Sequence, residues 1–133
     1  MYELKFELEF LKKKGNEFQD FFAAIMEVRY PDDFQRVRPW GKSGDRKNDG
    51  FRRSNGQLFQ VYAPNELTAT DAIAKIDEDF RGAQSFWKDH LKIWTFVHNA
   101  SSGLGPDVLA KLLDLRAEFS RGGDFTLRIP RIT

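Results

Sequence analysis

The sequence predicts an α/β domain in which a mixed β-sheet is flanked by helices. Three observations carry this prediction: helical and extended hydrophobic patterns alternate along the chain, an Asn-Gly pair marks a hairpin, and one strand is apolar throughout. Segments that alternate in this way favour a sheet whose faces are covered by helices, and a fully apolar strand is typical of a position buried on both sides. The 133 residues are expected to form a single domain with its own core.

Composition excludes several kinds of site. The chain has no cysteine, so a disulfide framework, a thiolate metal site and a cysteine nucleophile are all excluded. Its two histidines, His90 and His98, lie in different segments and form no metal pair. No apolar stretch approaches the roughly 18 residues that a membrane span needs, and the charged amino-terminal residues exclude a secretion signal. We therefore expect a cytoplasmic protein without a membrane partner.

The amino-terminal part of the chain predicts a strand, a helix and a second strand. Residues Tyr2–Leu11 alternate apolar side chains with Glu and Lys, which favours a half-buried strand, although the same residue types also favour a helix. Asn16 is a suitable cap for a helix that should end before Pro31, because a residue that precedes proline avoids the helical region. Phe34–Pro39 is predicted to be a short strand, and the loop Trp40–Lys47 follows it.

Two further strands, Asp49–Arg53 and Gln57–Tyr62, are predicted to form a hairpin. Asn55-Gly56 between them is the strongest two-residue signal for such a turn. A two-residue turn at this point would pair Asp49 with Tyr62 and Phe51 with Gln60. Asp49, Gln60 and Tyr62 would then share one face of the sheet, because side chains of a strand alternate between its faces.

The carboxyl-terminal part predicts helix, strand, helix and strand. A helix over Thr68–Lys88 has Thr68 or Thr70 as its cap, and Leu91–Val97 is the apolar strand. Pro106 suits the first turn of a helix that runs to about Phe119, and Phe125–Ile129 is the last strand. The apolar residues expected to face the core are Ile73, Ile76, Phe80 and Ala83 in the first helix and Val108, Leu109, Leu112, Leu113 and Leu115 in the second.

Charge is unevenly distributed along the chain. The formal net charge is only +1, but eight basic residues stand against four acidic ones between Arg29 and Arg53. Such a strip either binds a phosphate backbone or forms local ion pairs on a solvated surface. The residues predicted to contact nucleic acid are Arg36, Arg38, Lys42, Arg46, Lys47, Arg52 and Arg53.

Three short motifs stand out: EFQDFF (Glu17–Phe22) in the first helix, GDRKNDG (Gly44–Gly50) before the hairpin and QVY (Gln60–Tyr62) in its second strand. Together they resemble the PD-(D/E)xK nuclease superfamily, and within it the Mrr-like restriction endonucleases. In that family a helix carrying an acid precedes a strand, a GDxGxDG-type loop and a strand carrying (E/Q)xK. The resemblance runs from about Gly15 to Ile129, and it implies a restriction-endonuclease-like mixed sheet and metal-dependent hydrolysis of DNA.

The resemblance implies a role for each matching position. Asp49 corresponds to the central metal-binding carboxylate and Gln60 to the position often held by glutamate. The family lysine is replaced here by Tyr62, which can donate a hydrogen bond but carries no positive charge. Lys75 in the following helix could take over the charge, as could Lys47 in the loop. Lys75 could instead pair with Asp71 or Asp79 four residues away.

The implied cofactor is Mg²⁺ or Mn²⁺. A hard cation that keeps several waters needs only one or two carboxylates, so Asp49 would be the main ligand, with Gln60 adding its amide oxygen and the Val61 carbonyl assisting. Asp45 is either a further ligand or the residue that stabilises its Gly-rich turn. The helix acid falls near Gln19, which leaves Glu17 as a metal ligand or as an exposed first-turn acid favoured by the helix dipole.

Taken together, these residues predict a metal-dependent DNA endonuclease. Analogy suggests an effector in prokaryotic antiviral defence or restriction, either as the amino-terminal part of a larger protein or beside other subunits, and a homodimer that cuts both strands. The substitutions at Gln60 and Tyr62 favour an alternative, a catalytically inactive module on the same fold that binds nucleic acid or protein.

Overall fold

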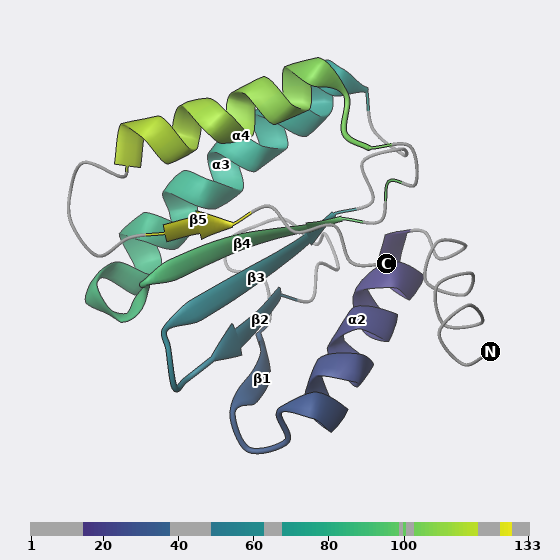
Figure 1. Ribbon diagram of the computed structural model, residues 1–133, viewed down its shortest axis with the longest axis vertical. Helices are drawn as coiled ribbons and strands as arrows, with labels where there is room; N and C mark the ends of the chain where they lie inside the picture. Colours follow the sequence, from purple (N-terminus) through teal and green to yellow (C-terminus); the bar gives the residue numbers. More distant parts are fainter. Residues whose placement is uncertain are drawn as a thin grey trace.

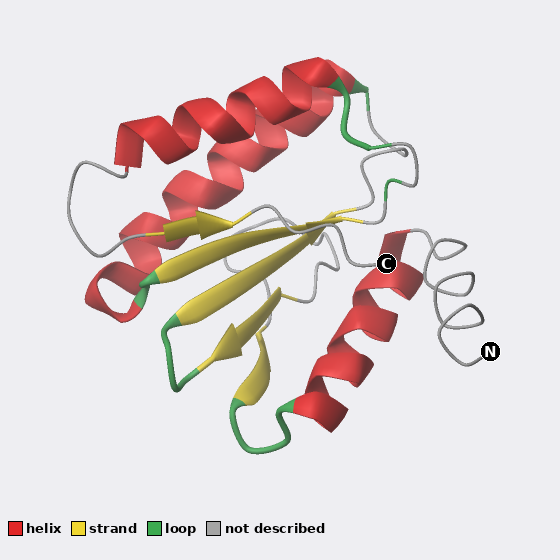
Figure 2. Cartoon of the chain, viewed as in Figure 1, coloured by secondary structure: helices red, strands yellow, loops and turns green. Residues whose placement is uncertain are grey.

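The computed structural model describes residues 15–37, 49–62, 68–98, 100, 103–119 and 126–128. Within these ranges the chain alternates helices with strands, as Figure 2 shows. The elements are α2 (Gly15–Arg29), β1 (Phe34–Val37), β2 (Asp49–Arg52), β3 (Gln57–Tyr62), α3 (Ala69–Trp87), the 3₁₀ turn η2 (Lys88–His90), β4 (Ile93–His98), α4 (Pro106–Phe119) and β5 (Thr126–Arg128).

The strands form one mixed sheet in the order β1-β2-β3-β4-β5. The first three strands are antiparallel, whereas β3 pairs with β4, and β4 with β5, in parallel. The longest pairing runs between β3 and β4, from Gln57 opposite Ile93 to Tyr62 opposite His98. The prediction of a mixed α/β sheet is therefore confirmed.

Helices cover both faces of this sheet (Figure 1). On one face, α3 and α4 pack against Leu58, Tyr62, Trp94 and Phe96. On the other face, the aromatic side of α2 packs against Phe59, Val61 and Val97. All six residues of β3 are buried, because β3 lies under helices on both sides. The sequence shows the same arrangement in β4, whose apolar residues leave no exposed face.

Helix boundaries agree closely with the sequence patterns. Thr68 caps α3 by accepting a hydrogen bond from the Asp71 amide at 3.1 Å, and α4 spans Pro106–Phe119 as predicted. Asn16 lies inside the first turn of α2 instead of capping it. In α4 the prediction that Leu109 and Leu113 face the core is wrong, since they are 40% and 47% exposed. The other side of this helix packs against the sheet and α3, and these two leucines lie away from it.

The predicted hairpin register is wrong by two residues. Gly50 pairs with Phe59 and Arg52 with Gln57, so the connection is the four-residue turn Arg53–Gly56. A two-residue type I′ turn requires positive φ at both central positions. Gly56 has φ +64°, but Asn55 is not among the described residues with positive φ. The two-residue shift preserves the side of the sheet on which each residue lies, so Gln60 and Tyr62 still share a face.

Asp33 holds this turn in place from the loop before β1. Its carboxylate accepts hydrogen bonds from the Ser54 hydroxyl and amide, both at 2.7 Å, and from Arg52 Nε at 2.9 Å. Its backbone carbonyl accepts from the Arg53 amide at 3.1 Å. The Ser54 hydrogen bonds and the Arg52 guanidinium lower the pKa of Asp33 from 3.8 to about 2. These contacts favour the longer turn over the Asn-Gly turn that the local sequence suggests.

Gly56 ends the turn where two strands approach closely. Its carbonyl accepts hydrogen bonds from the amides of Lys92 and Ile93 at 2.8 and 3.1 Å. A Cβ at this position would lie 2.6 Å from the His90 carbonyl oxygen. The residue must therefore be glycine for two reasons: its φ is positive, and the backbone that leads into β4 leaves no room for a Cβ.

Some predicted features fall outside the described residues. These are the strand Tyr2–Leu11, the Gly-rich loop Trp40–Lys47 and the side chain of Asp49. None of the described helices has the length and apolar character needed to cross a membrane.

Loss of the Asp33 carboxylate should destabilise the hairpin turn. A lowered folded-state pKa means that Asp33 contributes stability above pH 4, and this contribution is lost as the pH falls from about 4 to about 2. Asp33→Asn should lower the urea midpoint at pH 7 and flatten its dependence on pH in this window. Asp32→Asn is the matched control, because Asp32 contacts Arg53 through its backbone carbonyl; an equal effect in both variants would contradict the role of Asp33.

Gly56→Ala should be more costly than Gly103→Ala. Both glycines have positive φ, but a Cβ at Gly103 would meet nothing within 4 Å. We expect Gly103→Ala to lower the free energy of unfolding by about 1 kcal/mol and Gly56→Ala by about 3 kcal/mol. Urea unfolding of the two variants measures the difference, and equal costs would show that the clash with His90 is relieved by a shift of the chain.

Candidate functional site

The carboxyl ends of β3 and β4 bring most of the predicted catalytic residues to one edge of the sheet. Tyr62 and His98 occupy paired positions there, and both side chains are buried. The amino-terminal ends of α3 and α4 lie at this same edge, opposite the β2–β3 turn (Figures 1 and 2). Open α/β sheets commonly bind ligands outside the carboxyl ends of their parallel strands.

Tyr62 and Lys75 meet at a third side chain, Asp79. The Tyr62 hydroxyl donates a hydrogen bond to Asp79 Oδ2, and Lys75 Nζ lies 3.8 Å from Asp79 Oδ1. Tyr62 is almost fully buried, whereas Lys75 and Asp79 are 19% and 15% exposed. The cluster therefore has a buried hydroxyl, a partly exposed carboxylate and an ammonium group that solvent can reach. At 3.8 Å the ammonium forms an ion pair too long for a strong hydrogen bond.

Gln60 lies in the core beside Trp94. Its Oε1 accepts a hydrogen bond from Trp94 Nε1, and the side chain is only 2% exposed. This is the oxygen that was predicted to contact a metal ion. A carbonyl oxygen has a second lone pair, so a metal ion at this position would have to share the oxygen with the indole N–H.

Gln19 of α2 reaches the backbone of β3 from the opposite face. Its Nε2 donates a hydrogen bond to the Val61 carbonyl at 3.3 Å, and its side chain is 5% exposed. The predicted position of the helix acid thus lies beside the middle residue of the QVY segment. Glu17, which was the predicted ligand from this helix, is exposed in the first turn. An exposed first-turn acid is also what the helix dipole favours.

His98 adds an imidazole to the same edge. Its Nδ1 accepts a hydrogen bond from the Ala100 amide at 3.3 Å, so in its neutral form the proton lies on Nε2. The ring packs beside Phe96, with centroids 5.8 Å apart. This contact and the burial fix the orientation of the imidazole next to the Tyr62 position.

Asp49 begins β2 and pairs with Val37. Continuing the β2–β3 register by one residue would align its position with Gln60. A Cβ on the neighbouring Gly50 would lie 2.0 Å from the Phe34 ring, so close packing on β1 requires a glycine next to Asp49. Asp45, the other predicted acidic ligand in this part of the chain, lies outside the described residues.

The described donors at this edge are few for a divalent ion. Among the described residues, no group of three or more His, Asp or Glu side chains could hold a metal ion. The amide oxygen of Gln60 and the carbonyl of Val61 already accept hydrogen bonds from Trp94 and Gln19, and Asp49 would add a carboxylate. Mg²⁺ keeps most of its waters and can be bound through one or two carboxylates, so Asp49 is the residue on which such a site would depend.

Two of the basic residues predicted to contact nucleic acid lie away from this edge of the sheet. Arg52 pairs with Gln57 at the start of β3, five residues or about 16 Å from Tyr62, and Arg53 follows it in the turn. These two arginines therefore lie at the end of the sheet opposite Tyr62, because the hairpin turns there. Their contact with nucleic acid stays a prediction, as it does for Arg38, Lys42, Arg46 and Lys47 outside the described residues.

The arginines that are described also have partners within the chain. Arg36 lies 2.8 Å from Glu27 Oε1 and 3.6 Å from Asp20 Oδ1 on α2. Arg52 contacts Asp33 and stacks over Tyr30, 4.0 Å from the ring centroid. Arg53 donates a hydrogen bond to the Asp32 carbonyl. These contacts agree with local ion pairing, the alternative interpretation of the basic strip.

Sequence reasoning gave no role in the site to Gln19, Asp79 or His98, although it named Gln19 as the place of the helix acid and Asp79 as a possible partner of Lys75. Two of them carry a recognisable signal, since each is a polar residue on the apolar side of a helix. Gln19 lies between buried Phe18 and Phe22, and Asp79 between buried Ile76 and Phe80. A polar side chain on such a face must find a hydrogen-bond partner inside. His98 carries only the weaker signal of ending an apolar strand.

Comparisons with known proteins add no relative. No protein-family model matches the chain, and no curated protein and no solved structure matches it.

Replacing Gln60 with an apolar residue should destabilise the fold. Gln60→Leu leaves the indole N–H of Trp94 buried without its acceptor, which should lower the free energy of unfolding by about 1–3 kcal/mol. Gln35→Leu is the control, because Gln35 is an exposed glutamine of β1 and surface changes usually stay within about 0.5 kcal/mol. Urea unfolding of both variants measures the difference, with the near-ultraviolet spectrum of Trp94 as a second readout. Equal behaviour of the two variants would contradict this role of Gln60.

Proposed function

We propose that this chain is a divalent-metal-dependent nuclease that hydrolyses DNA phosphodiester bonds, with Lys75 in place of the missing strand lysine. The observation that carries the proposal is the contact of Lys75 and Tyr62 with the same carboxylate, Asp79. Tyr62 occupies the position of the family lysine, and its hydroxyl shares this carboxylate with an ammonium from the next helix. In this proposal the Lys75 ammonium supplies the positive charge that the motif lacks at Tyr62.

The chemistry divides among a few side chains. Mg²⁺ or Mn²⁺, when bound, would polarise the phosphoryl oxygen and lower the pKa of a water. Asp49 would hold the ion. Lys75 would stabilise the negative charge that develops on the phosphoryl oxygens, as preorganised cations do in such reactions. Asp79 orients Lys75 and keeps the Tyr62 hydroxyl fixed.

A second candidate function is a catalytically inactive module that binds nucleic acid. It is favoured by the hydrogen bond between Gln60 and Trp94 and by the amide of Gln19 beside the Val61 carbonyl. Neutral amides occupy both positions where the family resemblance expects acids, so the site carries less negative charge for a cation. Without a bound metal, neutral amides at these two positions make the fold more stable than carboxylates would, because carboxylates close together repel one another.

The biological setting is proposed by analogy alone. The resemblance to Mrr-like enzymes suggests a cytoplasmic effector in prokaryotic antiviral defence or restriction, acting with further domains or subunits. Cleavage of both DNA strands would require two active sites, which a homodimer supplies.

Plasmid cleavage tests the proposal. Purified protein should nick or linearise supercoiled plasmid with Mg²⁺ or Mn²⁺ but not with EDTA. Asp49→Ala should reduce cleavage to background, and Lys75→Ala should reduce it about 100-fold, the usual loss when one group that stabilises transition-state charge is removed. Calorimetric titration should show that Asp49→Ala also loses the metal ion, whereas Lys75→Ala keeps it.

Lys111→Ala is the matched control for Lys75→Ala. Lys111 is also a partly exposed lysine in an ion pair, with Nζ 2.7 Å from Asp77 Oδ1, but it lies on α4 and contacts a different carboxylate. Cleavage by Lys111→Ala should equal that of the wild type. Folded wild-type protein that binds DNA but neither binds metal nor cuts would support the inactive module.

A further inference from the structure

Three aromatic rings lie in series at the carboxyl end of α3. Phe86 is 61% exposed, and its ring meets the Trp87 ring edge to face, with centroids 5.2 Å apart. Trp87 in turn stacks on Phe51 of β2, with centroids 4.8 Å apart and an angle of 11°. The two inner rings are partly buried against the core. The series therefore fixes the place of Phe86 while most of its ring stays in contact with solvent.

A hollow beside these rings brings the β2–β3 turn and the start of β4 together. The Gly56 carbonyl accepts hydrogen bonds from the amides of Lys92 and Ile93, which tie the turn to the strand. Phe51 lines the hollow and so connects it with the aromatic series. The charged residues that line the hollow are Arg53, Asp89 and Lys92.

The cations at this end of the molecule lack carboxylate partners. Elsewhere in the described chain the ion pairs are Arg36 with Asp20 and Glu27, Arg52 with Asp33, Lys75 with Asp79, and Arg81 and Lys111 with Asp77. By contrast, Lys88 and Lys92 are exposed and form no ion pair with any residue that the structure describes. Arg53 contacts the backbone carbonyl of Asp32. Local ion pairing therefore does not account for these three cations, which outnumber the neighbouring acid, Asp89.

Lys88 is held in a backbone conformation that favours glycine. Its φ is 48° and its ψ is −120°, and no other non-glycine residue in the described ranges has a positive φ. Glycine adopts this region readily, whereas a residue with a Cβ is strained there. The helix dipole favours a cation at this end of α3, but a lysine in the last helical turn would supply that charge without strain. The strain thus indicates a use for the Lys88 charge outside the helix.

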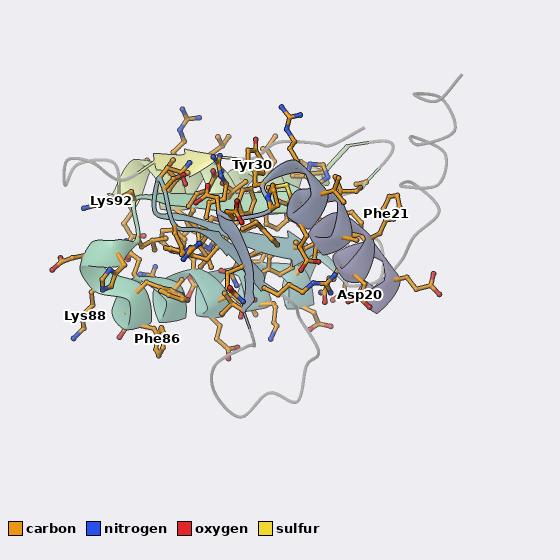
Figure 3. The ribbon with its side chains drawn as sticks, turned by 90° about the horizontal axis from the view of Figure 1, so that it is seen from below. Asp20, Phe21, Tyr30, Phe86, Lys88 and Lys92 are labelled. Atoms are coloured by element: carbon orange, nitrogen blue, oxygen red, sulfur yellow. The ribbon has the colours of Figure 1, made fainter. Side chains whose placement is uncertain are left out.

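The exposed ring and the unpaired cations lie at one end of the molecule. Figure 3 shows Lys92, Lys88 and Phe86 together at this end, with Asp20 and Phe21 of α2 at the other. Cations of this kind bind phosphate oxygens, and an exposed ring can stack on an unpaired base. A duplex would satisfy the cations alone, because its bases are already stacked on one another. The combination therefore favours a single strand.

We propose that Arg53, Phe86, Lys88 and Lys92 form a binding surface for a single strand of nucleic acid, here called the α3–β4 surface. The three cations would contact phosphates, and Phe86 would stack on a base. The choice of nucleic acid over another polyanion rests on the proposed function, but the surface contains none of the proposed catalytic residues. It lies about 16 Å from Tyr62, a length that about five stacked nucleotides would span.

Fluorescence anisotropy in EDTA measures binding without cleavage. The probes are labelled single strands of DNA and of RNA, about 15 nucleotides long, and the matching DNA duplex. One single strand should bind at least about fivefold more tightly than the duplex, and the tighter of the two identifies the source. No binding of either strand, or equal binding of the duplex, would overturn the inference. Plasmid cleavage with metal is measured separately, so a failure of this surface is distinguishable from a failure of the proposed nuclease.

Phe86→Ser tests the stacking contact. It should weaken binding of the strand at least about fivefold, the loss expected when one base loses its aromatic platform, while binding of the duplex stays unchanged. Val28→Ser is the matched control, because Val28 is also an exposed apolar residue, 84% exposed, but lies on α2 on the other face of the sheet. Equal affinities of these two variants for the strand would overturn the role of Phe86 and with it the preference for a single strand.

Lys88→Gly separates the charge from the backbone. It should raise the urea midpoint, because glycine relieves the strained φ, and yet weaken binding of the strand and lower the slope of its salt dependence by about one phosphate contact. Arg116→Gln is the matched control, since Arg116 is an exposed cation of α4 without an ion pair among the described residues. A Lys88→Gly protein that binds the strand as tightly as the control would overturn the assignment of phosphate contacts to this surface.

Discussion

The buried pairing of β3 with β4 is the constraint on which the rest of this structure depends. β3 is buried along its whole length and carries two glutamines, Gln57 and Gln60. A buried amide must be hydrogen-bonded, and both find their partner on β4. Gln57 reaches Thr95, two residues beyond its paired position, and Gln60 reaches Trp94, two residues before its own. Sliding one strand along the other would break both bonds, so the amides fix the register that the apolar neighbours alone would leave free to slip.

The same constraint limits the chemistry at the carboxyl edge. An amide that holds the core together cannot serve a metal ion without sharing its oxygen, and this is the situation of Gln60. The positive charge of Lys75 is not subject to this limit. Lys75 and Asp79 belong to α3, whose apolar side already faces the sheet, so a lysine of this helix reaches Tyr62 through Asp79 without a change in the strand. The strand thus supplies stability, and the helix supplies the charged groups with which a nuclease would act.

Much of the fold could be predicted because its patterns are local. The α4 boundaries and the Thr68 cap follow from single residues at helix ends, and the apolar run of β4 predicts its burial. The hairpin register could not be predicted, because it depends on Asp33, which is distant from the turn in sequence and selects a four-residue connection. Of the site, the ion pair of Lys75 with Asp79 was one of the two predicted roles of this lysine, because the two residues lie four apart on a helix. The bond of Tyr62 to Asp79 and the bond of Gln60 to Trp94 depend on tertiary packing that no local spacing encodes.

The four-residue turn also determines where two arginines of the basic strip lie. With the chain reversing at Arg53–Gly56, Arg52 and Arg53 lie at the amino end of β3, and the strand separates them from Tyr62. The same turn brings Arg53 and Asn55 beside Lys92, because Gly56 accepts hydrogen bonds from the start of β4. A shorter turn would remove these neighbours from one another. The four-residue connection held by Asp33 therefore places these polar side chains at the end of the sheet opposite Tyr62.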